Sequence, residues 1–205
     1  MIVGLAEAVA RLARGELVAY PTETVYALGA DAFSPAAVAR LLDAKGRPAE
    51  RGLSVAIADA AALARLVPAL PAAARRLAAR FWPGPLTLVV PVADPDFAEV
   101  ATPLGVGFRC SPQPSAAALA RAAAHPIVAT SCNRSGEPAA KTAAEVEACF
   151  GPGLPILGGE PASGLAPSTV VAVAADGELR LLRAGDLELA ELRAAARLPG
   201  LAGAE

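Results

Sequence analysis

The segment LVAYPTETVY (residues 17–26) joins a short apolar run to a cluster of polar side chains. Leu17 to Tyr20 is predicted as a buried strand, because an apolar run this short, followed by a turn residue, suits a strand. Pro21 cannot donate a ladder hydrogen bond and ends the predicted strand. The polar side chains that follow would then lie at the carboxyl edge of a sheet, where α/β proteins bind ligands. The segment therefore favours an α/β fold with a candidate site at this edge.

Strands and helices alternate along the rest of the chain, without a strict βαβ rhythm. Asp176-Gly177 is a hairpin turn signal and predicts two antiparallel strands around it. Thr142, three residues before Glu145, predicts a capping box at a helix start. The further predicted strands are residues 53–57, 86–90, 105–110, 127–129, 169–173 and 178–182. The predicted helices are residues 3–14, 35–44, 71–81, 115–124, 142–150 and 187–197, with one more beginning after Asp59.

The length and composition are those of one ordinary globular domain. The chain has 205 residues, of which 55% are hydrophobic and 19% are charged. A domain of this size can bury a sufficient core without a disulfide or a metal ion. We therefore expect a single α/β domain over residues 1–198, built on one twisted open sheet of mixed parallel and antiparallel strands with flanking helices. A disordered tail is expected over residues 199–205.

The charge and cysteine content exclude several classes of protein. With 18 Lys and Arg against 20 Asp and Glu, the net charge of -2 excludes a strongly basic protein that coats polyanions. Three cysteines without a C-x-x-C pair argue against a zinc ribbon and suit a reducing compartment. No apolar run is long enough to cross a bilayer, and the N-terminus lacks the basic region of an export signal. We therefore expect a cytoplasmic protein without membrane contact.

The polar side chains after Tyr20 have two interpretations. Thr22 and Thr24 supply donors and acceptors without fixed charge, which suits the positioning of a polar ligand. Alternatively, their hydroxyls cap a turn before the following segment. Arg109 and Arg183 each end a predicted strand, which is a position more typical of a surface residue than of a site.

The loop KGRPAERG (residues 45–52) carries three cations between glycine and proline residues. As a site, Lys45, Arg47 and Arg51 would form an anion cradle, because guanidinium groups bind phosphate or carboxylate with paired hydrogen bonds. As a solvated surface, the same loop would pair one of its cations with Glu50. The sequence leaves both interpretations open.

The loop ATSCNRSG (residues 129–136) follows a predicted strand and is dense in small polar groups. Ser131, Asn133 and nearby backbone N–H groups either point at one oxyanion or form a turn before the next helix. Asn133 is the one asparagine of the chain, which favours a functional loop. Cys132 is interpreted as a small side chain, because no basic partner can be assigned that would activate its thiol. His125 has no evident Ser or Asp partner in the sequence and is interpreted as structural.

Together and in this order, these segments resemble the YrdC/TsaC family of threonylcarbamoyl-AMP synthases, from about Ala19 to Gly185. The specific part of the resemblance is a Lys-x-Arg pair and a Ser-x-Asn pair with Trp-Pro-Gly-Pro between them. The length resembles the short bacterial form. Ala27, Cys132 and Ala172 depart from the residues that the family commonly has there. The matching segments are YPTET (residues 20–24), KGRP (45–48), FWPGPLT (81–87), GFR (107–109), TSCNRSG (130–136), PSTV (167–170) and LRAG (182–185).

The resemblance implies an activity and a site. The activity is that of a nucleotidyltransferase, L-threonylcarbamoyladenylate synthase, which makes threonylcarbamoyl-AMP and pyrophosphate from L-threonine, bicarbonate and ATP. The product would serve the threonylcarbamoylation of an adenosine in tRNA. The implied fold is an open α/β sheet with a concave, positively charged cavity. The implied catalytic residues are Lys45, Arg47, Ser131 and Asn133. The same four residues, together with Arg51 and Arg183, are the implied ATP contacts. The implied threonine contacts are Thr22, Thr24, Arg109 and Ser168.

The implied chemistry needs cations more than it needs a general base. Carboxylate, carbamate and triphosphate are all anions, and the basic loop with Arg109 and Arg183 would offset their repulsion. Mg²⁺ would bind through the nucleotide, since no acidic cluster in the sequence predicts a metal site built by the protein. We expect transfer of the product to a tRNA threonylcarbamoyl transferase complex, and weak tRNA binding. The alternative is a non-catalytic module that binds double-stranded RNA or tRNA, which the aromatic content of 4% disfavours.

Overall fold

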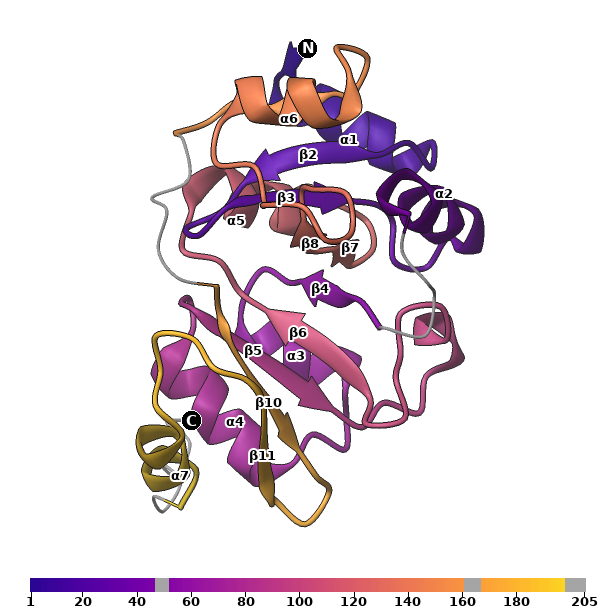
Figure 1. Ribbon diagram of the computed structural model, residues 1–205. Coiled ribbons are helices and arrows are strands. Elements are labelled where there is room, and N and C mark those ends of the chain that lie inside the picture. Colours follow the sequence, from indigo (N-terminus) through magenta and orange to yellow (C-terminus); the bar gives the residue numbers. More distant parts are fainter. Residues whose placement is uncertain (47–51, 161–166, 198–205) are drawn as a thin grey trace.

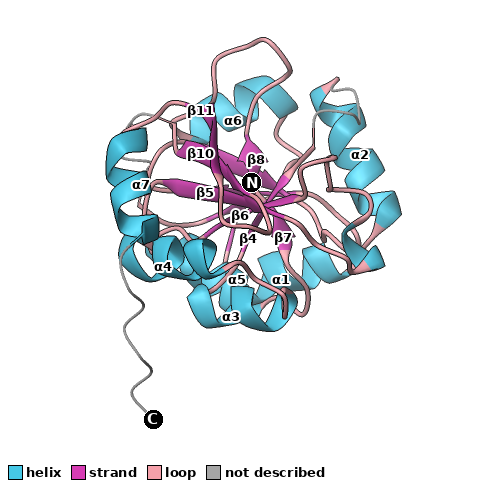
Figure 2. Ribbon diagram, turned by 90° about the horizontal axis from the view of Figure 1, so that it is seen from below, coloured by secondary structure: helices cyan, strands magenta, loops and turns pink. Residues whose placement is uncertain are grey.

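The strands form two mixed sheets, where the sequence predicted one. In the computed structural model, a five-stranded sheet lies in the upper half of Figure 1 and a six-stranded sheet lies below it, except for the edge strand at residues 127–128, which lies beside the upper sheet. Helices surround the strands, as Figure 2 shows, so the predicted α/β class with flanking helices is confirmed. The structure describes residues 1–46, 52–160 and 167–197. The predicted tail over residues 199–205 lies outside the described residues.

The five-stranded sheet is built from short strands that lie far apart in the sequence. In order across the sheet, its strands are β1 (Ile2–Val3), β9 (Ile156–Leu157), β2 (Val18–Pro21), β3 (Tyr26–Gly29) and β8 (Thr130–Ser131). β2 and β3 form an antiparallel hairpin, β9 pairs in parallel with β1 and β2, and β8 pairs antiparallel with β3. Only β2 was predicted among these five; β1, β8 and β9 have two residues each and are too short for a recognisable periodicity. β3 has four residues, as β2 does, and was missed although it is completely buried.

The six-stranded sheet contains the strands that the sequence predicts best. In order across the sheet, they are β11 (Leu179–Arg183), β10 (Thr169–Val173), β5 (Leu86–Val90), β6 (Val106–Arg109), β4 (Ser54–Ala56) and β7 (Ile127–Val128). β10 pairs in parallel with β5, and β4 in parallel with β6, while the other neighbours are antiparallel. The hairpin predicted around Asp176-Gly177 is confirmed as β10 and β11.

The two sheets are joined where one extended segment changes sheet. β7 pairs with β4 and β8 pairs with β3, with Ala129 between them. The Ala129 N–H donates to the Ser54 carbonyl (2.7 Å), and the Cys132 N–H donates to the Tyr26 carbonyl (2.8 Å). The prediction of a single sheet was wrong because β7 and β8, which are nearly continuous in the sequence, pair with strands of different sheets. The sequence predicts strands in this segment but does not show which strands they pair with. The main hydrophobic core contains buried side chains from strands of both sheets.

Helices begin at the capping residues that the sequence predicts. The Ser34 hydroxyl accepts from the Ala37 N–H (3.3 Å), and the Asp59 carboxylate accepts from the Ala62 N–H (2.7 Å). Gly46, with a left-handed φ of 58°, ends the helix that starts after Ser34. The helices are α1 (Leu5–Ala13), α2 (Pro35–Lys45), α3 (Ala60–Leu66), α4 (Ala72–Phe81), α5 (Pro114–Ala122), α6 (Ala143–Phe150) and α7 (Leu189–Arg197), with a 3-10 turn at Pro95–Phe97. In the described part of the chain, no helix has the length and hydrophobicity that a bilayer crossing requires.

The capping box at the start of α6 predicts a measurable loss of stability on mutation. Thr142 Oγ1 accepts from the Glu145 N–H (3.2 Å), and Glu145 Oε2 accepts from the Thr142 N–H (3.3 Å). Thr142→Ala should lower the free energy of unfolding by about 1 kcal/mol, because the Glu145 N–H loses its acceptor. In a thermal melt this corresponds to a Tm lower by about 2–4 °C. Thr142→Ser keeps the hydroxyl and should melt like the parent; an unchanged Tm for the alanine variant would contradict the prediction.

Candidate functional site

A cavity of about 460 Å³ lies between the two sheets. Its volume is within the range of small-molecule sites. The six-stranded sheet contributes residues of β4, β5, β6, β10 and β11, and the five-stranded sheet contributes the β2–β3 turn and β8. Most of the predicted site residues line it: Thr22, Thr24, Arg109, Ser131, Asn133, Ser168 and Arg183. Lys45 lies behind the loop after β8, and Arg47 and Arg51 lie outside the described residues.

One face of the six-stranded sheet forms the floor of the cavity. Arg183 is in register with Val170, and Val170 with Thr87. Thr87 lies opposite Arg109 on the next strand. Residues in register on neighbouring strands face the same side of a sheet, and all four line the cavity, whereas Leu88 points into the core. Strand pairing, with an irregularity in the β10–β11 register between Val170 and Val171, therefore brings two arginines that are far apart in the sequence over one surface.

The next row of the floor has a gap where a side chain could stand. Gly107 is in register with Val89 on one side and Ser54 on the other. A Cβ atom at Gly107 would lie 3.1 Å from Ser54 Oγ and 3.4 Å from Thr87 Cγ2. Because Gly107 has no side chain, the floor beside Arg109 stays open to a ligand.

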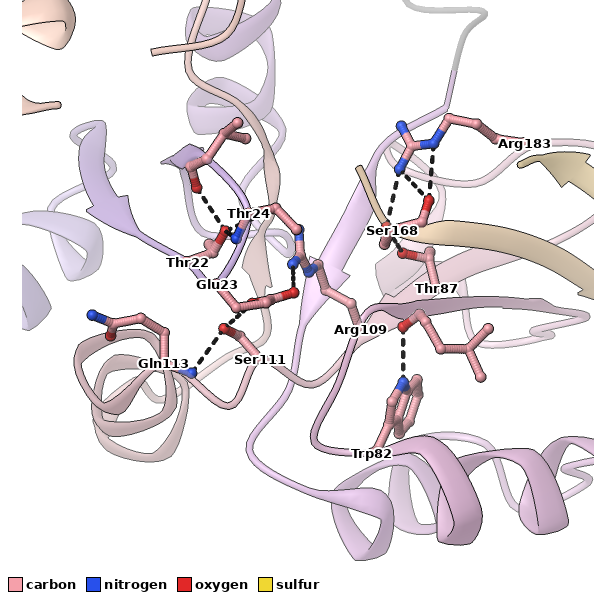
Figure 3. A network of polar contacts seen from close by, with 12 residues as sticks. Thr22, Glu23, Thr24, Trp82, Thr87, Arg109, Ser111, Gln113, Ser168 and Arg183 are labelled. Carbon is pink, nitrogen blue, oxygen red and sulfur yellow. Dashed lines mark hydrogen bonds and ion pairs between the residues drawn. The ribbon is translucent and has the colours of Figure 1, made fainter. Parts of the chain in front are cut away.

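Arg183 is held at the edge of the cavity by Ser168, as Figure 3 shows. Its Nε (3.1 Å) and Nη2 (2.9 Å) donate to the Ser168 carbonyl, and Nη2 also lies 3.0 Å from the Ser168 hydroxyl. That hydroxyl is 2.9 Å from the hydroxyl of Thr87. Ser168 is therefore both a lining residue and the anchor that orients Arg183.

Arg109 is held on the opposite side by Glu23, a residue that the sequence did not single out as part of the site. Arg109 Nη2 lies 2.5 Å from Glu23 Oε1, and Ser111 donates its hydroxyl hydrogen to Glu23 Oε2. Arg109 Nε is buried and has no hydrogen-bond partner among the described residues. The available signal for Glu23 was a lone carboxylate in a turn between two buried strands.

Arg109 and Arg183 face the same cavity and repel each other. Burial lowers the pKa of Arg183, and the positive charge of Arg109 lowers it further. Glu23 offsets one of these charges, and Glu137 is a further carboxylate in the described lining. An anion between the two guanidinium groups would be stabilised by both. The expected positive charge of the whole cavity stays a prediction, because it rests in part on residues 47–51, outside the described part of the chain.

Lys45 supports the loop after β8 from behind. Its side chain is buried, with 2% exposure, and its Nζ donates to the Ser131 carbonyl, to the Asn133 carbonyl (2.9 Å) and to Asn133 Oδ1 (3.3 Å). The Ser135 N–H in turn donates to the Lys45 carbonyl (2.8 Å). These contacts orient the loop; contact of the ammonium group with phosphate, as expected from the sequence, stays a prediction.

The side chains of Ser131 and Asn133 contact each other at the cavity wall. The Ser131 hydroxyl donates to Asn133 Oδ1 (2.6 Å), and Asn133 Nδ2 donates to the carbonyls of Arg134 (2.9 Å) and Glu137 (2.7 Å). The Asn133 amide therefore closes the loop on itself. The Ser131 hydroxyl can rotate, so it is the group of this pair that can turn toward a ligand.

The threonine pair caps the β2–β3 turn, and its contact with a ligand stays a prediction. Thr22 Oγ1 donates to the Val25 carbonyl (2.6 Å) and accepts from the Thr24 N–H (3.3 Å), which caps the β2–β3 turn. The two hydroxyl oxygens are also 3.2 Å apart and line the cavity. The turn is therefore both structural and part of the cavity wall.

Burial predicts which cysteine reacts first with an alkylating reagent. Burial raises the pKa of Cys132 to about 12, although the charge of Lys45 opposes the shift. Its thiolate fraction at pH 8 is therefore about 1 in 10⁴. Cys149 is only partly buried and should be carboxamidomethylated by iodoacetamide about tenfold faster or more. Peptide mass spectrometry of the native and the denatured chain measures both rates; equal native rates would contradict this prediction.

Comparison with known proteins places the chain in one family. The Sua5/YciO/YrdC family model, described as telomere recombination, matches residues 10–185. A Bacillus subtilis protein named threonylcarbamoyl-AMP synthase is 43% identical over 145 residues, which cover 69% of this chain and 42% of that protein. A Chromohalobacter salexigens protein of the same name is 41% identical over 169 residues, which cover 81% of this chain and 90% of that protein. The chain thus spans less than half of the first relative and most of the second.

A solved structure agrees with these matches. The crystal structure of Pyrococcus abyssi Sua5 complexed with L-threonine matches with a TM-score of 0.84 and 35% sequence identity, over 95% of this chain and 60% of that one. The names of the two sequence relatives are those of enzymes. Because the family model covers most of the chain and the relatives exceed 40% identity, the chain belongs to the Sua5/YciO/YrdC family.

Proposed function

We propose that the protein is an L-threonylcarbamoyladenylate synthase, a nucleotidyltransferase that converts L-threonine, bicarbonate and ATP into threonylcarbamoyl-AMP, pyrophosphate and water. One observation carries the proposal: polar residues from distant segments converge on a single cavity, and each comes from a segment that resembles the synthase family. The names of the relatives and the L-threonine bound to P. abyssi Sua5 support it.

The threonine would bind on the floor of the cavity. Its carboxylate would lie between Arg109 and Arg183, where two guanidinium groups face one space. Thr22, Thr24 and Ser168 would contact its polar groups, since their hydroxyls line the same space. The open floor at Gly107 leaves room for the amino acid beside Arg109.

The nucleotide would bind along the opposite wall. Ser131 and Asn133 would contact the phosphates, with Arg183 at the boundary between the two ligands. Lys45 would act on the phosphates through the loop that it supports. Arg47 and Arg51 lie outside the described residues, and their contacts with ATP are proposed from the sequence alone.

The reaction would run in two steps. The threonine amine and bicarbonate first give a carbamate and water. A carbamate oxygen then attacks the α-phosphorus of ATP, forming the mixed anhydride as the bond to pyrophosphate breaks. Each pair of anions 4 Å apart repels by about 4 kcal/mol at an effective dielectric near 20, so Arg109, Arg183 and the basic loop would lower the barrier by offsetting that repulsion.

Mg²⁺ would enter on the triphosphate and not in a site of the protein. In the described part of the chain, no group of three His, Cys, Asp or Glu side chains is placed to hold a metal ion.

The test is product formation by the purified chain. Incubation with ATP, L-threonine and bicarbonate should give threonylcarbamoyl-AMP by mass spectrometry and an equal amount of pyrophosphate. Omission of bicarbonate should abolish both, and serine in place of threonine tests the side-chain specificity. Arg47→Ala should reduce the rate by about tenfold or more, as expected for loss of a phosphate contact. A salt-dependent tRNA gel shift without any threonine-dependent pyrophosphate release would contradict the proposal and favour a binding module.

The product would pass to a transferase that modifies tRNA, since a mixed anhydride hydrolyses if it is not consumed. We therefore propose a cytoplasmic location, since ATP, threonine and tRNA occur together there. Direct transfer to a partner complex and weak tRNA binding stay predictions.

A further inference from the structure

Glu23 is a buried carboxylate beside the cavity, and neither step of the proposed reaction uses it. Its side chain has 8% exposure. One oxygen accepts from Arg109 Nη2 at 2.5 Å, and the other accepts from the Ser111 hydroxyl. Figure 3 shows Glu23 between these two partners. A carboxylate bound at both oxygens is fixed in direction, because any rotation breaks one of the two contacts.

The network behind Glu23 continues to a helix start. The Ser111 hydroxyl accepts from the Gln113 N–H (3.2 Å), and Gln113 Oε1 caps the first turn of α5. Gln113 Nε2 donates to the Glu160 carbonyl (3.1 Å). The Glu23 carboxylate is therefore anchored to rigid structure on the side away from the cavity.

Arg109 depends on this anchor. Among the described residues, Glu23 is the one hydrogen-bond partner of the Arg109 guanidinium group, whose Nε is buried without a partner. Arg183, the second cation at the cavity, repels Arg109 and is itself held by Ser168. Without Glu23, the Arg109 guanidinium group would have no hydrogen bond to residues 1–46, 52–160 or 167–197 to hold it against that repulsion.

We infer that Glu23 is a positioning residue for Arg109, and that it makes the cavity select an amino-acid carboxylate over a simple inorganic anion. A guanidinium group fixed in direction binds a planar carboxylate at one place and in one orientation. A guanidinium group free to turn binds any small anion. The inference rests on the proposed function, because it takes the carboxylate of L-threonine as the group that Arg109 binds.

The test measures selectivity and not affinity alone. Calorimetric titrations without ATP or bicarbonate give the Kd of L-threonine and of sulfate for the parent, Glu23→Ala and Glu23→Gln. The alanine variant removes both contacts, so the ratio of sulfate Kd to threonine Kd should fall by about tenfold. The glutamine variant removes the charge but keeps the shape and a hydrogen-bonding amide, so both ligands should change together and the ratio should equal that of the parent.

Three controls separate positioning from general damage. L-threonine methyl ester lacks the carboxylate charge and should bind the parent and Glu23→Ala equally weakly. Glu7→Ala breaks an exposed Arg11–Glu7 pair of similar length (2.7 Å) far from the cavity and should leave the ratio unchanged. If Glu23→Ala does not fold, Ser111→Ala removes one anchor alone and should lower the ratio by about threefold.

Several outcomes would overturn the inference. An unchanged ratio in Glu23→Ala, or in Ser111→Ala where the first variant does not fold, would mean that Glu23 acts through charge alone. An equal weakening of both ligands with a lower Tm would mean a structural role. The proposed function is judged separately, by whether the parent forms threonylcarbamoyl-AMP. A parent that binds no L-threonine would overturn both.

Discussion

Replacement of Arg109 by glutamine should lower threonine-dependent pyrophosphate release by about 100-fold, because the threonine carboxylate loses one of its two guanidinium partners. The loss should appear mainly in the KM for threonine, since Ser131 and Asn133 on the other wall are untouched. The free energy of unfolding should fall by about 3 kcal/mol, because the substitution removes the buried ion pair between Arg109 and Glu23. Steady-state kinetics and thermal melts measure the two effects.

A double variant separates these two effects. Glu23→Gln with Arg109→Gln replaces a buried charged pair by a neutral pair of similar shape, which should recover most of the lost stability. Activity should stay low, because the guanidinium group is still missing. Recovery of activity together with stability would show that Arg109 acts only through the fold, and a single variant with near-parental KM would contradict its place at the substrate.

Lys45→Met is the second substitution with a large expected effect. Methionine has a similar length but cannot donate, so the carbonyls of Ser131 and Asn133 lose a buried donor. We expect about 3 kcal/mol less stability and a rate lower by about 100-fold, because the wall that would orient the phosphates loses its support. Catalytic assays measure the change in rate, and thermal melts measure the change in stability.

Limited proteolysis reports on the loop directly. Arg134 is exposed in the loop that Lys45 supports, so trypsin should cut after it about tenfold faster in Lys45→Met than in the parent. The matched control is Lys141→Met, which changes the other lysine of the chain at an exposed position before α6. A loss of activity without faster cleavage after Arg134 would contradict the role of Lys45 in holding the loop after β8. It would favour direct contact of Lys45 with the nucleotide.

The longer elements could be predicted because their signals are local. β5 has the bounds read from its apolar run, and α6 begins at the capping box that Thr142 and Glu145 form. A helix cap or an apolar run acts within a few residues, so the local sequence is enough to predict where such an element begins or ends. β1 and β9 were missed because each has two residues and is defined by pairing, as in Ile2 with Ile156.

The candidate site could be predicted as a set of residues but not as an arrangement. Thr22, Ser131 and Ser168 were chosen for their chemistry and for their resemblance to a known family, and they do line one cavity. The position of Lys45 behind the loop, and the link from Glu23 to Arg109, could not be read from the sequence. The position of Lys45 and the contact between Glu23 and Arg109 both depend on the direction in which a side chain projects from its strand or loop.

The amino-acid order alone settled the α/β class, most helix starts and the polar segments that supply the site. Those properties come from propensities and motifs that neighbouring residues carry. Only the folded chain decided that Ala129 marks the change from one sheet to the other, and that Arg109 and Arg183 share a face. The pairing of these strands and the burial of these side chains depend on contacts between residues far apart in the sequence. Such contacts form only in the folded chain, so local sequence patterns do not reveal them.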